Sequence, residues 1–333
     1  MPRRILLILN PAARAGRASQ KISGVKSQIE KTGCHVSLQE SAGRGDATVI
    51  AAAAATAGGF DVIAAAGGDG TAREVCSGVL SSARPDQPVA VVPLGTGNDL
   101  AHVAGTGTLA AAVRAVTSGT PRAFDAIQVE CLAGNRPVAT HAFCFAAVGL
   151  AADVVRLTTP TVKKLFGPRL CYSVGFFRAL AGYRPVAAQV VCDGGDHAGD
   201  YLLICAGNTA HAGGRMMHLS PGASPHDGAL DLSLIRATSR VEVALQFIRL
   251  LRGTHVRHRR ATYFRTKEIK VTTATASEVQ LDGDTIGLTP ARFTVLPGAL
   301  RLITPAEGPK NPRAVPSQRG SAATETSCRI ASE

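Results

Sequence analysis

Two glycine-rich stretches of this chain carry residues whose types and spacing could do chemistry. Residues 67–71 read Gly-Gly-Asp-Gly-Thr, and residues 93–100 read Pro-Leu-Gly-Thr-Gly-Asn-Asp-Leu; each follows an apolar run. A glycine-rich turn exposes successive backbone N–H groups, and a helix that follows it adds the positive end of its dipole. Both features favour a bound phosphate. For either stretch taken alone, a tight turn without a ligand is the alternative.

A third turn, Asn10-Pro11 with Gly16 close behind, follows the apolar run 5–9. Ligands bind at the carboxyl ends of the strands in a parallel sheet. Three such turns, delivered by strands of one sheet, would meet at one edge. Together they therefore indicate a phosphate-bearing ligand.

The elements that must position these turns alternate in type. Continuous apolar runs alternate with helix-compatible segments up to about residue 118, which predicts a doubly wound parallel sheet. After Pro121 the chain reads mostly as antiparallel strands with turn signals, among them 126–132 and 140–150. Two helical stretches interrupt these strands near 161–182 and 239–252.

We therefore predict an α/β + β fold: an N-terminal doubly wound α/β nucleotide-binding domain and a C-terminal, mostly antiparallel β-sandwich domain. The predicted bounds are 1–122 for the first domain, which about 298–306 rejoins, and 123–297 for the second. Residues 307–333 are rich in Pro, Ser, Arg and Gly and poor in apolar residues, so we expect a disordered tail.

Composition and charge indicate where the protein is located and which partners it binds. The 333 residues are 45% hydrophobic, but no apolar run has the length needed to span a bilayer. The start resembles a signal peptide, yet its apolar run stops at Asn10-Pro11, so we expect a cytoplasmic protein. The net charge of +12 favours an anionic partner: nucleic acid, a membrane surface or a phosphorylated ligand. Nucleic acid is not expected, because the few aromatics are not interleaved with the basic residues.

The two glycine motifs together resemble the catalytic domain of the diacylglycerol kinase family, which includes bacterial lipid kinases and sphingosine and ceramide kinases. Gly-Gly-Asp-Gly-Thr also occurs in NAD kinases, whereas the motif at 93–101 is typical of the lipid kinases. Residues 206–235 and 280–284 resemble later motifs of the family, so the resemblance extends to about residue 305. It implies the NAD kinase/diacylglycerol kinase-like fold, with ATP bound between the two domains.

The resemblance also implies which residues contact the nucleotide. Ser41 matches the family's hydroxyl residue four positions before Gly45-Asp46-Ala47. The implied ATP-binding residues are Asn10, Pro11, Ala12, Ala13, Arg14, Ser41, Gly67, Gly68, Asp69, Gly70, Thr71, Ala72, Arg73, Thr96, Asn98 and Asp99.

The late acidic motif implies the catalytic groups. Its last residue, Asp284, would be the general base, with Asp282 beside it, and Asp69 would hold the Mg²⁺ that accompanies ATP. A second, structural Mg²⁺ is implied at Asp227, together with the backbone oxygens of Ser224 and Ala229. Carboxylate and carbonyl oxygens are suitable ligands for this ion.

Three positions depart from the family's pattern. Asp284 stands where the family usually has Glu, Arg14 where it often has Gly, and His102 where Arg is common. The shorter acid could change the rate or the position of the acceptor. None of the three departures removes a phosphate-binding glycine.

The implied function is an ATP-dependent lipid kinase that transfers the γ-phosphoryl group to a lipid hydroxyl, with diacylglycerol as first candidate and phosphatidic acid as product. Phosphatidylglycerol or a sphingoid base are other acceptors. An NAD kinase and a non-catalytic lipid- or nucleotide-binding regulator remain alternatives, and a homodimer is possible.

Two basic segments suggest how the chain reaches a lipid. Residues 162–184 mix basic residues with Leu, Phe and Tyr, which suits a helix on a membrane surface; a core helix with a solvated basic face is the alternative. A second cluster has five arginines between 249 and 260, with His255 and His258 among them. We expect peripheral membrane association.

Overall fold

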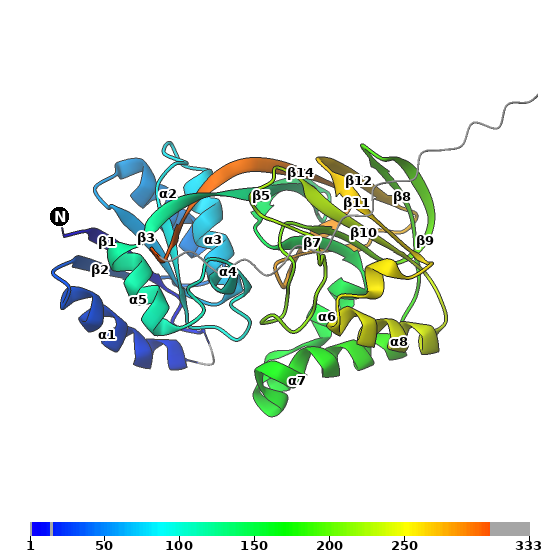
Figure 1. The fold of residues 1–333 in the computed structure, drawn as a ribbon, viewed down its shortest axis with the longest axis horizontal. Coiled ribbons are helices and arrows are strands. Elements are labelled where there is room, and N and C mark those ends of the chain that lie inside the picture. The colour runs from blue at the N-terminus through cyan, green and yellow to red at the C-terminus, as the bar shows by residue number, and fades with distance from the viewer. Residues whose placement is uncertain (1, 14–15, 307–333) are drawn as a thin grey trace, which may run out of the picture.

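The computed structural model describes residues 2–13 and 16–306, which form two lobes (Figure 1). We call residues 2–119 the N-terminal lobe and residues 120–299 the C-terminal lobe. Arg14 and the expected tail at 307–333 lie outside the described residues.

The N-terminal lobe is built on parallel strands in the order β2-β1-β3-β4. These strands are β1 (Arg4–Leu9), β2 (His35–Glu40), β3 (Val62–Gly67) and β4 (Val89–Pro93). The helices of this lobe are α1 (Arg17–Glu30), α2 (Asp46–Ala57), α3 (Asp69–Leu80), α4 (Asp99–Val103) and α5 (Leu109–Ser118).

Strand β1 shows why helices cover both faces of this sheet. Successive side chains of a strand point to opposite faces. Leu6 and Ile8 pack with the apolar sides of α2 and α3, while Ile5, Leu7 and Leu9 pack with those of α1 and α5. A strand that is apolar at every position needs cover on both faces, so the predicted doubly wound arrangement is confirmed.

Antiparallel strands form a sandwich in the C-terminal lobe. One layer holds β5 (Thr120–Ala133), β6 (Arg136–Ala142), β8 (Val186–Cys192), β12 (Glu268–Thr273) and β14 (Asp284–Thr304). The other holds β7 (Phe145–Gly149), β9 (Gly195–Gly207), β10 (Leu230–Arg236), β11 (Ala261–Thr266) and β13 (Glu278–Leu281).

Strand β7 lies between two apolar cores. Ala146 and Val148 point into the sandwich, and Phe145 and Ala147 point to the opposite face. That face is covered by α6 (Leu150–Leu157), α7 (Pro160–Ala181), α8 (Arg240–Leu251) and the short 3₁₀ helix η1 (His255–Arg257). Figure 1 shows α7 and α8 along the lower side of this lobe, away from β14 and β5.

Two long strands connect the lobes. β5 and β14 run side by side over both of them (Figure 1), and the pairing extends from Leu288 with Leu132 to Thr304 with Thr120. Near its end, Leu302 of β14 also pairs with Val89 of β4. The chain therefore returns to the N-terminal sheet after it has completed the sandwich.

The structure differs from the expected elements at two places. The predicted strand 140–150 is broken at residues 143–144, between β6 and β7, because the three amides around the break bond a carboxylate described below. Strand β11, which pairs with β10, was not predicted from its mixed, arginine-containing sequence. None of the helices in the described part of the chain combines the length and apolarity that crossing a bilayer requires.

Candidate active site

The glycine turns after β3 and β4 pack backbone against backbone. The Leu94 amide donates to the Gly67 carbonyl at 2.8 Å. A Cβ atom on Gly95 would lie 2.3 Å from the Gly68 Cα, and one on Gly68 would lie 3.3 Å from the Gly95 Cα. Only hydrogen fits between these turns. The two motifs that the sequence singled out therefore form one surface at the carboxyl edge of the sheet.

The end of β1 joins the same edge. The Asn10 Nδ2 donates to the Thr71 Oγ1 at 3.2 Å, and the Asn10 Oδ1 accepts from the Ala12 amide at 3.0 Å. Ser41, at the end of β2, is buried and donates its amide to the Leu9 carbonyl at 2.8 Å. The three predicted turns thus meet in space, with the half-buried Pro11 and Ala13 at their rim.

Asn98 closes the turn after β4. Its φ of 57° is left-handed, its Oδ1 accepts from the Gly95 amide at 2.9 Å, and its Nδ2 donates to the Gly95 carbonyl at 3.0 Å. A short polar side chain tolerates this conformation because it bonds its own turn. Asn98 therefore shapes the predicted phosphate-binding turn through its side chain.

Asp69 ties the first glycine turn to the second. Its Oδ2 accepts from the Asn98 amide at 2.7 Å, and its Oδ1 accepts from the Asp99 amide at 2.5 Å. A Cβ on Gly97 would lie 2.6 Å from that Oδ2, so Gly97 must be glycine for the carboxylate to fit. Both oxygens of the residue expected to hold a metal are thus engaged with backbone.

Asp99 continues this chain of contacts into the C-terminal lobe. Its Oδ2 accepts from the Gly213 amide and its Oδ1 from the Gly214 amide, each at 2.7 Å. Asp99 was expected among the nucleotide contacts. In the structure its carboxylate faces the loop after β9 and fixes the two lobes relative to each other.

Asp282 is buried at the tip of the β13–β14 hairpin. Its Oδ2 accepts from the Phe143 amide at 2.7 Å, and its Oδ1 accepts from the Cys144 and Phe145 amides at 2.8 and 2.9 Å. These three bonds hold the break between β6 and β7. Asp282 and Gly283 have positive φ values of 48° and 93°, which make the tight turn that delivers Asp284.

Asp284 lies against the first glycine motif. Its Oδ2 is 3.1 Å from the Arg73 Nη2, and a Cβ on Gly70 would lie 3.0 Å from the same oxygen. The Asp284 side chain is 39% exposed, whereas that of Arg73 is only 7% exposed. Arg73, which we expected at the nucleotide, pairs with the candidate base and holds it at the junction of the lobes.

Three buried acids, Asp69, Asp99 and Asp282, belong to this site. Burial raises the pKa of Asp69, and the nearby charge of Asp99 raises it further. Burial also raises the pKa of Asp99 and brings the pKa of Asp282 to about 6. Among the described residues, no Lys or Arg forms an ion pair with Asp69 or Asp99. Buried carboxylates without a basic partner favour an added cation.

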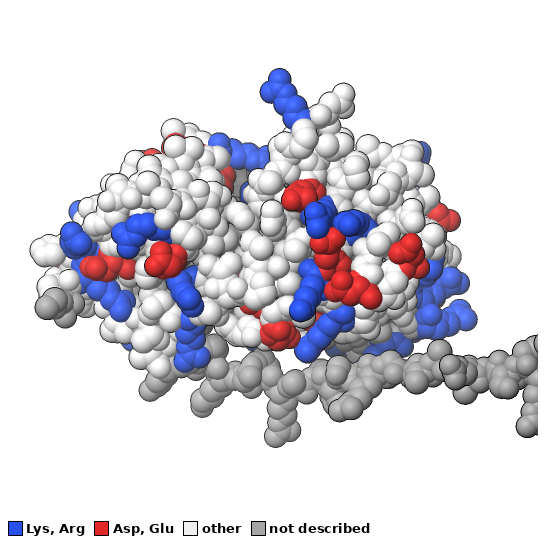
Figure 2. All heavy atoms as spheres, turned by 90° about the horizontal axis from the view of Figure 1, so that it is seen from above, with Lys and Arg blue, Asp and Glu red and all other residues white. Residues whose placement is uncertain are grey.

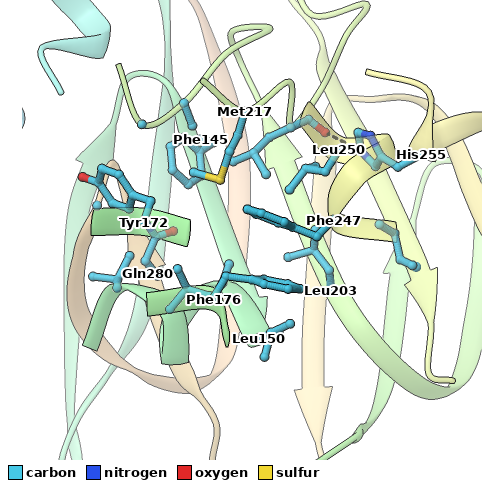
Figure 3. A pocket seen from close by; sticks show the side chains of 18 of the residues that line it. Phe145, Leu150, Tyr172, Phe176, Leu203, Met217, Phe247, Leu250, His255 and Gln280 are labelled. Atoms are coloured by element: carbon cyan, nitrogen blue, oxygen red, sulfur yellow. Dashed lines mark hydrogen bonds between the residues drawn. The ribbon is translucent and has the colours of Figure 1, made fainter. Parts of the chain in front are cut away.

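An apolar pocket lies beside these acids in the C-terminal lobe (Figure 3). Its cavity volume is about 90 Å³. Phe176 of α7 and Phe247 of α8 stack across it with ring centroids 4.0 Å apart. Asp99, Asp282 and Gly283 are part of the lining, so the pocket reaches the polar centre.

Buried polar atoms without a partner interrupt the apolar lining. Neither the nitrogen nor the oxygen of the Gln246 amide has a hydrogen-bond partner in the described structure, and the same holds for the Gln280 Oε1 and the His255 Nδ1. Gln280 lies near Tyr172 at one end of the pocket and His255 at the other (Figure 3). Such atoms are costly to bury, which suits a ligand that carries polar groups.

Sequence reasoning missed this pocket. The helical period of 240–251 offered one signal, because Val243, Gln246, Phe247 and Leu250 share a face. His255, which we placed in a surface basic cluster, is buried, and burial lowers its pKa to about 4. That assignment was wrong, because η1 turns the imidazole inward.

The residues expected at a structural Mg²⁺ site lie apart from this centre. The Asp227 Oδ2 is 3.2 Å from the Arg265 Nη2, and its Oδ1 accepts from the Ala229 amide at 3.2 Å. The Arg265 guanidinium thus occupies the place where a metal ion would contact the Asp227 carboxylate. Asp227 supplies the only carboxylate of the expected set, whose other members are Ser224 and Ala229. As placed, these residues do not fit a metal ion.

Comparison with known proteins agrees with this architecture. Residues 4–129 match the family described as diacylglycerol kinase catalytic domain. Residues 145–304 match the family described as YegS C-terminal NAD kinase beta sandwich-like domain. The two matched segments include the glycine motifs, Asp282 and Asp284.

Individual relatives match over nearly the whole chain. A protein named diacylglycerol kinase from Bacillus subtilis (strain 168) is 28% identical over 308 residues, which cover 92% of this chain and 97% of that protein. One from Staphylococcus aureus (strain bovine RF122 / ET3-1) is 28% identical and covers 92% and 93%. The crystal structure of a diacylglycerol kinase from Bacillus anthracis str. Sterne has the same fold, with a TM-score of 0.69, 21% identity and coverage of 91% and 97%.

Proposed function

The chain belongs to the diacylglycerol kinase catalytic-domain family, and from this premise we propose that it is an ATP-dependent lipid kinase. The proposed acceptor is the free hydroxyl of diacylglycerol. One observation carries the proposal: Asp284 lies against Gly70 at the carboxyl edge of the sheet, next to an apolar pocket in the other lobe. A carboxylate between a phosphate-binding edge and an apolar pocket suits transfer of a phosphoryl group to a lipid.

ATP would bind along the edge made by Asn10, Gly67–Gly70 and Gly95–Asn98. Close packing of the two glycine turns excludes side chains from this edge, where backbone N–H groups would bind the phosphates. The Mg²⁺ that arrives with ATP would be held by Asp69, through water where its oxygens already accept amide hydrogens. When bound, this ion neutralises charge on the transferring phosphoryl group.

Asp284 would act as the general base. As the lipid oxygen attacks the γ-phosphorus, its proton passes to the Asp284 carboxylate, the bond to the ADP oxygen breaks, and a phosphate ester forms. Positioned proton transfer of this kind contributes about 100- to 10,000-fold to the rate. Arg73 would hold the carboxylate in place through its bond to Oδ2. An aspartate here reaches one methylene less than the family's usual glutamate.

An acyl chain would occupy the pocket whose wall includes the stacked rings of Phe176 and Phe247. Gln280 lines the pocket and is two residues from Asp282 on the same hairpin, so its free Oε1 could accept a hydrogen bond from a group near the reacting hydroxyl. The pocket's apolar lining supports an apolar acceptor over a dinucleotide, whose charged groups would be desolvated there.

The test is transfer of label from [γ-³²P]ATP in mixed micelles to a panel of diacylglycerol, phosphatidylglycerol, a sphingoid base and NAD. Wild type and Asp284→Asn run side by side, with ATP binding measured for both. We expect label on diacylglycerol, reduced about 100- to 10,000-fold in the variant, with ATP binding retained.

Other outcomes would assign a different function. Label on another lipid would change the acceptor and keep the kinase. Label on NAD would make the protein an NAD kinase. ATP binding without label on any acceptor would favour a non-catalytic regulator.

A further inference from the structure

Helices α7 and α8 expose large apolar side chains to solvent. On α8, Val241, Leu245 and Ile248 are 74%, 51% and 46% exposed. They are spaced by four and three residues, so they form one stripe along the helix. On α7 the exposed apolar side chains, between 47% and 72% exposed, are Leu165, Phe166, Leu170 and Phe177. Exposed apolar residues concentrated on neighbouring elements mark an interaction surface.

The two helices lie next to each other and are apolar on both faces. Phe176 of α7 stacks on Phe247 of α8, and Phe177 meets Phe247 edge-on at 6.1 Å. The inner faces of both helices line the apolar pocket. The exposed apolar side chains therefore lie on the same pair of helices that lines this pocket.

The charged residues of these helices are basic except for one glutamate. α7 contains no acidic residue, and the single acid of α8, Glu242, is paired with His258 and Arg260. Among the described residues no ion pair engages Arg178, Arg249 or Arg252, which lie on or just after the helices. Arg252 follows Ile248 by one helical turn and so continues the exposed stripe.

The opposite face of the lobe has a different character. Figure 2 looks onto that side, where Lys and Arg are interspersed with Asp and Glu. Arg292 pairs there with Glu130 and Glu268, and Lys270 pairs with Glu268. Among the described residues, the helical face combines exposed apolar side chains with arginines that form no ion pair.

We propose that the outer faces of α7 and α8 dock the protein on an anionic lipid bilayer, so that a lipid passes from the membrane into the pocket beneath these helices. The proposal rests on the lipid kinase function and names the surface that serves it. Leucine and phenylalanine side chains enter the headgroup and acyl boundary, and each nearby Arg adds about 1 kcal/mol on anionic lipid.

Charge complementarity favours a bilayer over a second copy of the chain. A twofold-symmetric contact through this face would bring the same patch from each copy together. Arginines would then meet arginines, since α7 offers no acid and Glu242 is already paired. An anionic membrane supplies the missing negative charge.

The test is flotation of the full chain with phosphatidylcholine vesicles that contain or lack phosphatidylglycerol, at low salt. Three variants are compared with wild type: Leu170→Ser with Leu245→Ser, Arg249→Gln with Arg252→Gln, and Val49→Ser. Val49 is the matched control, because it is 66% exposed but lies on α2. Phosphorylation of a short-chain diacylglycerol below its micellar concentration is measured in parallel.

We expect wild type and Val49→Ser to bind anionic vesicles equally. The leucine pair should weaken binding at least about tenfold, and the arginine pair about 30-fold on anionic vesicles only. Phosphorylation of the short-chain lipid should stay unchanged in all three variants. Sedimentation of each variant tells docking from self-association.

Equal vesicle binding by all variants would overturn the proposal, and so would a dimer that the leucine pair converts to monomer. The kinase function would stand in either case if the short-chain lipid is still phosphorylated. Conversely, vesicle binding that follows the expected pattern without phosphorylation of any lipid would keep the docking surface and reject the kinase.

Discussion

The glycine edge of the N-terminal lobe and the apolar pocket of the C-terminal lobe differ in the hydrogen bonding of their buried polar groups. At the edge and on the hairpin that meets it, the carboxylates of Asp69, Asp99 and Asp282 each bond at least two backbone amides. In the pocket, Gln246 and His255 leave polar atoms without protein partners.

This difference relates each region to its ligand. A phosphate group has fixed geometry, so the edge is held rigid by carboxylates that fix three separate loops. A lipid varies in chain and headgroup, and a pocket of apolar side chains tolerates that variation. Under the proposed function, the pocket's polar atoms that lack a partner among the described residues would pair with polar groups of the lipid. The carboxylates of the edge already bond backbone amides and shape the site.

The largest effect should come from breaking the best-satisfied carboxylate. Asp282→Asn places an amide nitrogen against backbone N–H groups, and we expect a loss of about 3 kcal/mol in the free energy of unfolding. Asp284→Asn, two residues along and 39% exposed, should cost less than about 1 kcal/mol while it abolishes activity. Urea denaturation measures both. Equal losses in the two variants would contradict the structural role of Asp282.

Next in size is a change in the contact between the glycine turns. Gly95→Ala would place a methyl group 2.3 Å from the Gly68 Cα, and we expect kcat/KM for ATP to fall about 30-fold as the turns separate. Gly24→Ala is the control, because nothing lies within 4 Å of a Cβ there and alanine favours helix α1. An unchanged kcat/KM in Gly95→Ala would show that the edge is not rigid.

The buried acids should also make stability depend on pH. Burial and the charge of Asp99 raise the pKa of Asp69 from 3.8 to about 7. The folded protein then binds more protons than the unfolded chain between about pH 4 and pH 7, so stability falls as pH rises through this range. Between about pH 4 and pH 7, the Tm of wild type, measured by scanning calorimetry, should fall by about 3 °C more than the Tm of Asp69→Asn. A difference that grows in the opposite direction would reject the raised pKa.

In the pocket, replacement of a buried polar side chain should raise the stability of the protein and not lower it. Gln246→Leu removes an amide that is buried without a partner, and we expect the lipid-free protein to gain about 1 kcal/mol while KM for the lipid rises. Gln87→Leu is the control: Gln87 is equally buried, but its Nε2 donates to the Phe60 carbonyl at 3.2 Å, so it should lose about 1 kcal/mol. A loss of stability in both variants would contradict the difference between the glycine edge and the pocket.

The smallest effect concerns Asp227, which has the basic partner that the buried acids lack. Arg265→Gln should lower stability by about 0.5 kcal/mol, because the Arg265 side chain is 52% exposed. Addition of EDTA to wild type should leave the Tm unchanged. A drop in Tm with EDTA that exceeds the effect of the variant would restore the structural metal site.

Much of the fold could be predicted from local patterns. The uninterrupted apolar runs of β1, β3 and β4 predicted a parallel sheet with helices on both faces, and the family comparisons agree. The Asp282-Gly283 pair marked a hairpin. The break at 143–144 could not be predicted, because its cause is a carboxylate 137 to 139 residues away.

The site was predictable in its members but not in their roles. Gly67, Gly95 and Asp284 are brought together as the motifs suggested. Arg73, Asp69 and Asp99 bond other protein groups, since a side chain's partner depends on which loops the fold places beside it. The pocket was not foreseen, because its walls come from α6, α7, α8 and several strands that are apolar for packing in any fold.

By itself, the sequence determined the alternation of strand and helix, the glycine turns and the acidic hairpin, because these depend on backbone freedom and on periodicity within a few residues. Only the tertiary structure decided which carboxylates are buried, that Arg73 meets Asp284, and that α7 and α8 are apolar on both faces. Those properties depend on burial and on contacts between segments far apart in the chain, where desolvation and close packing set the energy.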